Sequence, residues 1–178
     1  ARLSKFNVQS ISDLTSHNDL KLKRMGKEKI AIFAVIPDDT PAYNFLVGIL
    51  YTQLFQQLYR SADLYPGKKL PVPVHFLMDE FANVALPKGF DNLLSTMRQR
   101  QIFCSIILQN LSQLKALYEK QWESIVGNCD SFLYLGGNEQ STFEYVSKRL
   151  GTETLDTNTT GRSKGRNGSY TTNYQTTK

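Results

Sequence analysis

The sequence predicts an α/β sandwich, a mostly parallel sheet with helices on both faces. Short apolar runs recur four times along the chain, the first of them rich in β-branched residues, and each is followed by a segment with helical spacing of apolar residues. Such runs are typical of strands buried on both faces, and their alternation with helices predicts parallel pairing through right-handed crossovers. With 178 residues, 40% hydrophobic and 21% charged, the chain can build its own core and is neither fibrous nor wholly disordered.

The first half of the chain predicts one strand and one long helix. Residues 1–28 have mixed polarity and weak periodicity, which indicates a short helical or irregular lead-in. The run Ile30–Ile36 predicts a buried strand and is too short to cross a bilayer. Thr40 and Pro41 are a typical N-cap and first helical residue, and apolar spacing predicts a helix from there to about Tyr59.

The second half predicts three more strands. They are the runs Val74–Met78, Ile102–Leu108 and Ser131–Leu135. We expect helices after them, at about 90–99, at about 111–126 and up to Leu150, where Gly151 is a typical C-cap. The composition then changes to Thr, Asn, Ser, Gly and Arg, which predicts a flexible basic tail over residues 152–178.

Positive charge is concentrated in two stretches. The chain has 21 Lys and Arg against 16 Asp and Glu, a formal net charge of +5. Residues 21–29 contribute +4 and residues 157–178 another +4, so the remainder carries −3. This balance argues against a uniformly basic nucleic-acid binder, and each stretch alone is typical of solvated charge on a loop or tail.

The sequence lacks the motifs of several kinds of chemistry. Cys104 and Cys129 form no CxxC or Cys/His cluster, and two histidines are too few for a histidine-rich metal site. The cysteines are expected to be reduced, buried thiols of a cytosolic protein, with a disulfide as the alternative. Neither a G-x-S-x-G elbow nor a G-x-x-x-x-G-K-[ST] phosphate loop occurs in the 178 residues.

Polar side chains at the ends of two predicted strands are the sharpest functional signal. Asp79 and Glu80 follow the strand Val74–Met78, and Gln109 follows the next strand. Function in parallel α/β sheets gathers at these carboxyl ends. A phosphate-cleaving site could be formed from these three groups. One carboxylate would hold Mg²⁺, the second would polarise the attacking water, and the amide would hydrogen-bond that water or a phosphate oxygen. Taken singly, these residues are more typical of strand ends and helix caps.

Four segments together resemble the later half of the motor domain of type IV secretion coupling proteins, the TraG/TraD-like ATPases of conjugative transfer. They are KIAIFAVIPDDTPAYNFLVGILYTQLFQ, VPVHFLMDEFANV, STMRQRQIFCSIILQNLSQL and WESIVGNCDSFLYLGGNE. The resemblance covers residues 29–151 and implies a RecA-like, P-loop NTPase-type, three-layer α/β/α sandwich. It also implies that residues 1–28 connect an all-helical insert back to the motor domain. It does not include residues 152–178, which are expected to be a tail.

The resemblance implies roles for single residues, with ATP and Mg²⁺ as the cofactors. Asp79 corresponds to the Walker B acid on the metal side, and Glu80 to the catalytic base beside the nucleotide. Gln109 matches the sensor glutamine, and Arg98 matches a proposed arginine finger. Arg98 and Arg100 lie on the predicted helix between the two strands, where each alone is also a typical solvated cation.

The family's phosphate loop, its strand and its membrane anchor are missing from these 178 residues. That strand lies centrally in the family's sheet, between the Gln109 strand and Ser131–Leu135. The sheet is therefore expected to close its gap, fill it from elsewhere, or leave apolar edges exposed. We expect an excised piece or a degenerate relative, inactive alone.

For the whole protein, the resemblance implies a homohexamer on the cytoplasmic side of the bacterial cell membrane, anchored through an N-terminal region. Its partners would be DNA and secretion-channel proteins. The alternative from the sequence is a non-enzymatic module that binds nucleic acid or a protein partner. A third reading, an α/β hydrolase with Asp79 as nucleophile, has no partner motif.

Overall fold

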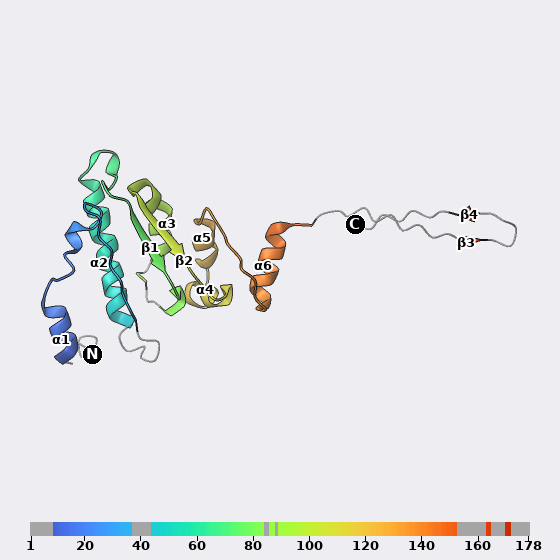
Figure 1. The fold of residues 1–178 in the computed structure, drawn as a ribbon, viewed down its shortest axis with the longest axis horizontal. Helices are drawn as coiled ribbons and strands as arrows, with labels where there is room; N and C mark the ends of the chain where they lie inside the picture. Colours follow the sequence, from blue (N-terminus) through green and yellow to red (C-terminus); the bar gives the residue numbers. More distant parts are fainter. Residues whose placement is uncertain are drawn as a thin grey trace. The chain divides into compact units, whose positions relative to one another are not determined.

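The computed structural model describes residues 9–36, 44–83, 86–87, 89–152, 163–164 and 170–171. The chain divides into two units, residues 1–133 and residues 134–178. The first unit contains a two-stranded parallel sheet, β1 (Val74–Met78) and β2 (Ile102–Ile106), with helices beside it (Figure 1). In the part of the chain that the structure describes, no helix is both long and apolar enough to span a membrane.

The helices of the first unit, in chain order, are α1 (Gln9–Ser16), η2 (Leu22–Arg24), α2 (Asn44–Asp63), η4 (Pro66–Lys68), η5 (Phe81–Asn83), α3 (Phe90–Met97), η6 (Arg98–Arg100), α4 (Leu111–Tyr118) and α5 (Trp122–Gly127). The η elements are single 3₁₀ turns. The second unit contains α6 (Gln140–Leu150) and two short antiparallel strands, β3 (Ser163–Lys164) and β4 (Tyr170–Thr171).

The two-stranded sheet buries one face and exposes the other. β1 and β2 pair in parallel, in the register Val74↔Ile102 to Met78↔Ile106. Burial alternates along β1, with Val74, Phe76 and Met78 buried and His75 and Leu77 exposed. The expectation of a strand buried on both faces is therefore wrong for β1. The physical reason is that α2 and α3, which precede and follow β1 in sequence, both pack on the same face.

Aromatic rings hold the two helices on that buried face. The Phe55 ring of α2 lies 4.7 Å from the Phe76 ring of β1 and 5.9 Å from the Phe90 ring of α3, measured between centroids. Phe55 and Phe90 are 1% and 0% exposed. Full burial of one such side chain stabilises a fold by about 1.5–3 kcal/mol, so this cluster is a principal anchor of β1.

Two predicted strands do not form. Residues 30–36 and 131–135 have no strand partner, and their outward side chains are exposed: Phe33 88%, Val35 92%, Leu133 82% and Leu135 89%. Apolar composition favours a strand only where a neighbouring strand supplies hydrogen bonds and a packed face. Of the outcomes expected for the sheet, the structure shows exposed apolar residues.

The long helix α2 ends later than predicted. It begins at Asn44 and ends at Asp63, four residues beyond the predicted end at Tyr59. The predicted N-cap, Thr40, and the first helical residue, Pro41, lie outside the described residues. Leu54 and Leu58, two of its apolar positions, are buried as the helical spacing requires.

The helix predicted over residues 111–126 is two helices, α4 and α5. The break follows Tyr118, where Glu119 has a φ of 30° and the Gln121 N–H donates to the Tyr118 carbonyl. A positive φ is disfavoured for a residue with a side chain, so the turn ends α4. The second strand is also shorter than predicted and stops at Ile106 instead of Leu108.

The second unit has a well-capped helix. Glu139 is the N-cap of α6, and hydrogen bonds from Thr142 and Ser141 lower the pKa of its carboxyl to about 2. Gly151 is the C-cap, as predicted. The strands β3 and β4 were not predicted in the basic tail, and the rest of that segment after Thr152 lies outside the described residues.

Gly26 joins the basic stretch 21–29 to the segment that leads into β1. Its carbonyl accepts a hydrogen bond of 3.0 Å from the Val72 N–H. Its φ is +75°, and a Cβ there would lie 2.9 Å from both terminal methyl carbons of Leu70 and 3.3 Å from the Cδ2 of Leu58. This position therefore requires glycine for its conformation and for its close packing.

Gly26→Ala should destabilise the chain by about 2–4 kcal/mol, because a left-handed backbone and an overpacked contact are penalised together. The matched control is Gly67→Ala, since Gly67 has a φ of +67° but no atom within 4 Å of the added Cβ. It should cost only about 1 kcal/mol. Urea unfolding followed by circular dichroism measures both. Equal losses would show that packing against Leu70 contributes nothing.

Candidate functional site

The acid pair Asp79–Glu80 lies in a turn that is fixed on both sides. Met78 before it and Phe81 after it are 2% and 1% exposed. The turn is also bonded to the chain beyond β2: the Ile107 N–H donates to the Met78 carbonyl at 3.0 Å, and the Phe81 N–H donates to the Ile107 carbonyl at 3.2 Å. The two carboxylates are therefore exposed on a backbone that cannot shift without disturbing the core.

The conformation of the pair is unusual. The Asp79 Oδ1 accepts a hydrogen bond of 3.0 Å from the Glu80 N–H, and Glu80 has a φ of 48°. A left-handed residue with a side chain is sparsely populated and costs of order 1 kcal/mol or more, and such positions cluster at functional sites. The Asp79 hydrogen bond offsets part of that cost and holds the turn.

Gln109 lies at the same end of the sheet. Met78, the last residue of β1, is in register with Ile106, the last residue of β2, so Asp79 and Gln109 both follow the carboxyl ends of neighbouring strands. The Gln109 side chain is exposed, and its Oε1 accepts a hydrogen bond of 3.4 Å from the Gln113 Nε2. The structure thus brings three of the four predicted site residues, Asp79, Glu80 and Gln109, to one edge.

The residue after Gln109 explains why its backbone is held in place. Asn110 is the N-cap of α4, and its Oδ1 accepts hydrogen bonds from the Gln113 N–H at 3.0 Å and the Ser112 hydroxyl at 2.7 Å. Capping belongs to Asn110, so the Gln109 amide, three residues beyond the end of β2, is not the helix cap. The capping alternative considered for this position therefore applies to its neighbour.

Arg98 lies at the opposite end of the strands. It is in η6, before the first residue of β2, and donates a hydrogen bond of 3.2 Å to the Asp130 carboxylate. Both side chains are exposed, Arg98 79% and Asp130 80%. A five-residue strand spans about 16 Å, so Arg98 cannot share a site with Asp79 within one copy of the chain.

Arg100 has a structural role that the sequence analysis missed. Its guanidinium carbon lies 4.5 Å from the centroid of the Tyr59 ring, and its Nη2 lies 3.8 Å from the Asp63 carboxylate. The side chain is 19% exposed, so the interpretation as a solvated helix-end cation is wrong. Tyr59 and Asp63 are four residues apart on α2, but nothing in the sequence links them to Arg100.

The two cysteines are free thiols, not a disulfide, and neither is an activated nucleophile. Burial raises the pKa of the Cys104 thiol to about 12, and the same cause raises the pKa of Cys129. The reactive form of a cysteine is the thiolate, which these environments disfavour near neutral pH. The candidate chemistry therefore rests on the carboxylates.

The donor set at the acid edge fits Mg²⁺. Among the described residues there is no cluster of three or more His, Cys, Asp or Glu side chains that would form a complete protein metal site. Mg²⁺ does not need one, because it is usually held by one or two carboxylates together with water and substrate phosphates. The exposed carboxylates of Asp79 and Glu80 supply hard oxygen ligands of that kind.

Comparison with known proteins gives one family and several relatives. The family described as the TraM recognition site of TraD and TraG matches residues 73–178. VirD4 of Rhizobium rhizogenes is 25% identical over 154 residues, which cover 85% of this chain and 22% of that protein. The conjugal transfer protein TraG of Agrobacterium fabrum is 28% identical over 134 residues, 72% of this chain and 19% of that protein. No solved structure matches the chain.

The chain spans about a fifth of the length of these relatives. The family match begins one residue before β1 and includes both strands of the sheet, the acid pair and Gln109. Because the family match covers more than half of the 178 residues, the chain belongs to the TraG- and TraD-like family of type IV secretion coupling proteins.

Proposed function

We propose that the chain carries the metal-binding and water-activating half of an ATPase site, in a coupling protein that delivers DNA or protein substrates to a type IV secretion channel. One observation carries the proposal: two carboxylates and an amide lie at the carboxyl ends of adjacent, in-register parallel strands. The sheet would be part of a RecA-like α/β/α sandwich. Family membership supports the coupling role.

Each residue has a separate task in this proposal. Asp79 holds Mg²⁺, which neutralises charge on the ATP phosphates when bound. Glu80 accepts the proton of the attacking water, and its backbone position is fixed by the buried Phe81 beside it. Gln109 hydrogen-bonds that water or a γ-phosphate oxygen. Hydrolysis then needs little further covalent chemistry from the protein, because positioning and charge stabilisation dominate phosphoryl transfer.

The whole protein is proposed to be a homohexamer on the cytoplasmic side of the cell membrane, in contact with channel proteins. Arg98 would then act as an arginine finger only on a neighbouring subunit's nucleotide, since it lies at the opposite end of the strands from its own acid pair. The family description names TraM recognition, so a relaxosome protein of that kind is a proposed partner of residues 73–178.

The 178-residue chain should bind ATP·Mg²⁺ weakly or not at all. The backbone cradle and lysine that hold the β- and γ-phosphates belong to a phosphate loop, and no such motif occurs in this sequence. Isothermal calorimetry with the purified chain tests this directly. A micromolar dissociation constant would mean that the chain contains a phosphate site of another kind.

In the whole coupling protein, Glu80→Gln should lower kcat for ATP hydrolysis by about 10²–10⁴-fold and leave nucleotide affinity nearly unchanged. Asp79→Asn should also raise the Mg²⁺ concentration needed for half-maximal rate, because it removes a charge from the metal ligand. Glu123→Gln changes an exposed carboxylate of α5 that has no proposed role, and serves as the control. If Glu80→Gln hydrolyses ATP at the parental rate, Asp79 and Glu80 only cap the end of the strand.

Mixed hexamers test the finger. Arg98→Ala should lower turnover by about 10³-fold or more while ATP still binds. Mixing Arg98→Ala subunits with Glu80→Gln subunits should restore part of the activity, because some interfaces then combine an intact base with an intact finger. Activity that never exceeds that of the separate variants, despite demonstrated co-assembly, would remove Arg98 from the site.

Two controls separate the finger from other effects of Arg98. Asp130→Asn removes the ion pair of Arg98 but keeps its charge, so it should retain turnover. Arg60→Ala removes an exposed arginine of α2 and should change nothing. If Asp130→Asn reproduces the loss seen in Arg98→Ala, the arginine acts through that local ion pair. Arg100 is unsuitable as a control because it packs on Tyr59.

A further inference from the structure

The side-chain amide of Gln109 has a partner on the helix that follows it. Gln113 lies in the first turn of α4, and its Nε2 donates a hydrogen bond of 3.4 Å to the Gln109 Oε1. The other arm of the planar Gln109 amide, the Nε2, therefore points away from Gln113. Within the part of the chain that the structure describes, this Nε2 donates no hydrogen bond. The pair leaves the NH₂ group, a donor, as the part of the Gln109 amide that is available to a ligand.

Gln113 is held in place through its backbone and through the packing of α4. The Gln113 N–H donates to the Asn110 Oδ1 at 3.0 Å, which is the N-cap bond of the helix. Leu114, the next residue, is 1% exposed, and the ring of Tyr118 at the end of α4 stacks on the Phe81 ring at 5.9 Å. Phe81 directly follows the acid pair, so α4 packs against the same turn. The Gln113 side chain therefore starts from a backbone that is fixed relative to the acid edge.

The field of α4 favours the same orientation of the Gln109 amide. Gln109 immediately precedes the N-cap of α4, where the N–H groups of the first turn leave a partial positive charge. A carbonyl oxygen turned toward this helix end is stabilised, whereas an amide NH₂ group there would face other donors. The helix end and the Gln113 donor therefore act in the same direction, and both turn the Gln109 Oε1 toward α4.

We propose that Gln113 is a positioning residue that fixes which end of the Gln109 amide meets the nucleotide. This role rests on the proposed function, in which Gln109 bonds either the attacking water or a γ-phosphate oxygen. Phosphate oxygens accept hydrogen bonds, so they match the Gln109 Nε2. A water held by the Oε1 would have to lie on the side of the amide that Gln113 occupies. The pair thus assigns Gln109 to the γ-phosphate, which ATP has and ADP lacks.

The first test changes the hydrogen-bonding sense of residue 113 in the whole coupling protein. Gln113→Lys keeps a donor, Gln113→Met keeps the length without a donor, and Gln113→Glu supplies only an acceptor. Gln113→Glu should turn the amide round and lower both turnover and the affinity for a non-hydrolysable ATP analogue by about threefold to tenfold, the range of one neutral hydrogen bond. Gln113→Met should lose about threefold, and Gln113→Lys should stay within about twofold of the parent. ADP affinity should not change, because ADP has no γ-phosphate.

Two controls separate hydrogen bonding from charge. Ala116→Glu and Ala116→Lys place the same charges one turn along α4, on an exposed residue with no proposed role, and should stay within about twofold of the parent. The second control is a double-mutant cycle. In a Gln109→Ala background, Gln113→Glu should cost less than about twofold, because the amide that it turns is gone. A loss of the same size in both backgrounds would mean that Gln113 does not act through Gln109.

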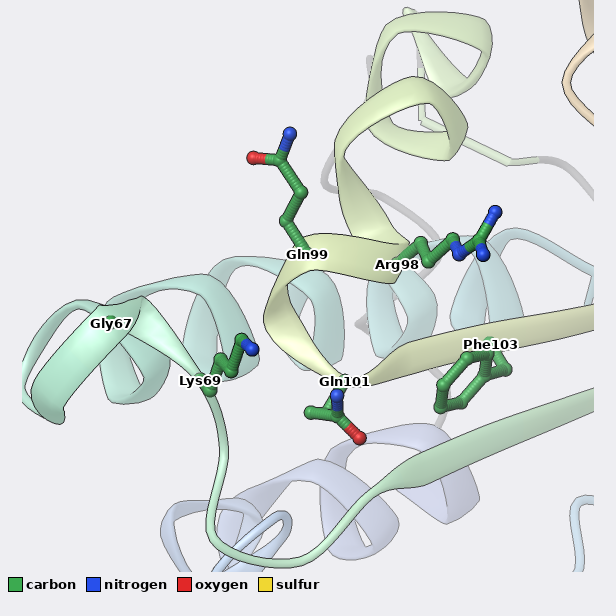
Figure 2. Close-up of a pocket in the computed structure, with 6 residues that line it drawn as sticks. All are labelled: Gly67, Lys69, Arg98, Gln99, Gln101 and Phe103. Atoms are coloured by element: carbon green, nitrogen blue, oxygen red, sulfur yellow. The ribbon is translucent and has the colours of Figure 1, made fainter.

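The second test observes the amide itself and needs no nucleotide. In the 178-residue chain, ¹⁵N relaxation should give the Gln109 side-chain amide a higher order parameter than the amide of Gln99. Gln99 is exposed and lies in η6 at the other end of the strands, and Figure 2 shows its amide pointing away from the other labelled side chains. Gln113→Met should lower the Gln109 value to that of Gln99. Gln113→Glu should keep the amide ordered and shift one of its protons downfield, because the Nε2 then donates to the new carboxylate.

Three results would overturn the proposal. They are a Gln109 amide as mobile as that of Gln99 in the parent chain, a loss of analogue affinity in Gln113→Lys as large as in Gln113→Glu, and a fall in turnover with unchanged analogue affinity, which would place Gln109 on the water. If Gln109→Ala keeps parental turnover and analogue affinity, the proposed function fails at Gln109 and the positioning role fails with it. Failure of the positioning role alone leaves the loss in Gln109→Ala intact.

Discussion

The parallel, in-register pairing of β1 with β2 is the constraint on which the acid edge and the proposed finger both depend. It gives the sheet two chemically different ends, because residues that follow the strands meet at one edge and residues that precede them meet at the other. Asp79, Glu80 and Gln109 follow the strands, whereas Lys69 and Arg98 precede them. The buried rings of α2 and α3 hold that arrangement, so packing of one sheet face fixes where each charge lies.

The aromatic core reaches directly into the acid edge. Phe81 follows Glu80 in sequence and is almost fully buried. Its ring is tilted against the Phe90 ring, with centroids 5.6 Å apart, and stacks on the Tyr118 ring at 5.9 Å. Burial raises the pKa of Tyr118 to about 12. The left-handed conformation of Glu80 is held by this core and by the Asp79 hydrogen bond. A turn that positions a general base, as proposed for Glu80, requires that kind of rigidity.

Features carried by a short segment were predictable from the sequence, and features that join distant segments were not. β1 and the positions of Asp79 and Gln109 follow from an apolar run that ends in polar residues. The runs 30–36 and 131–135 have the same local signal and fail, because a strand also needs a neighbour with free hydrogen-bonding groups. The packing of Arg100 on Tyr59 and the meeting of residues 21–29 with Lys69 depend on tertiary contacts that no local pattern encodes.

If ATP binds at the acid edge as proposed, the placement of charge requires contributions from outside the chain. Two adjacent carboxylates repel a polyphosphate, and the repulsion must be offset by Mg²⁺ and by cations before ATP can lie there. Arg98, the cation assigned to this chemistry, lies at the far end of strands about 16 Å long, and the nearby lysines lie with it. Positive charge at the amino end of one copy can therefore serve the acid edge only in a second copy. In the proposed hexamer, this geometry would couple assembly to hydrolysis, because separating the subunits would remove the proposed finger while leaving the acid pair intact.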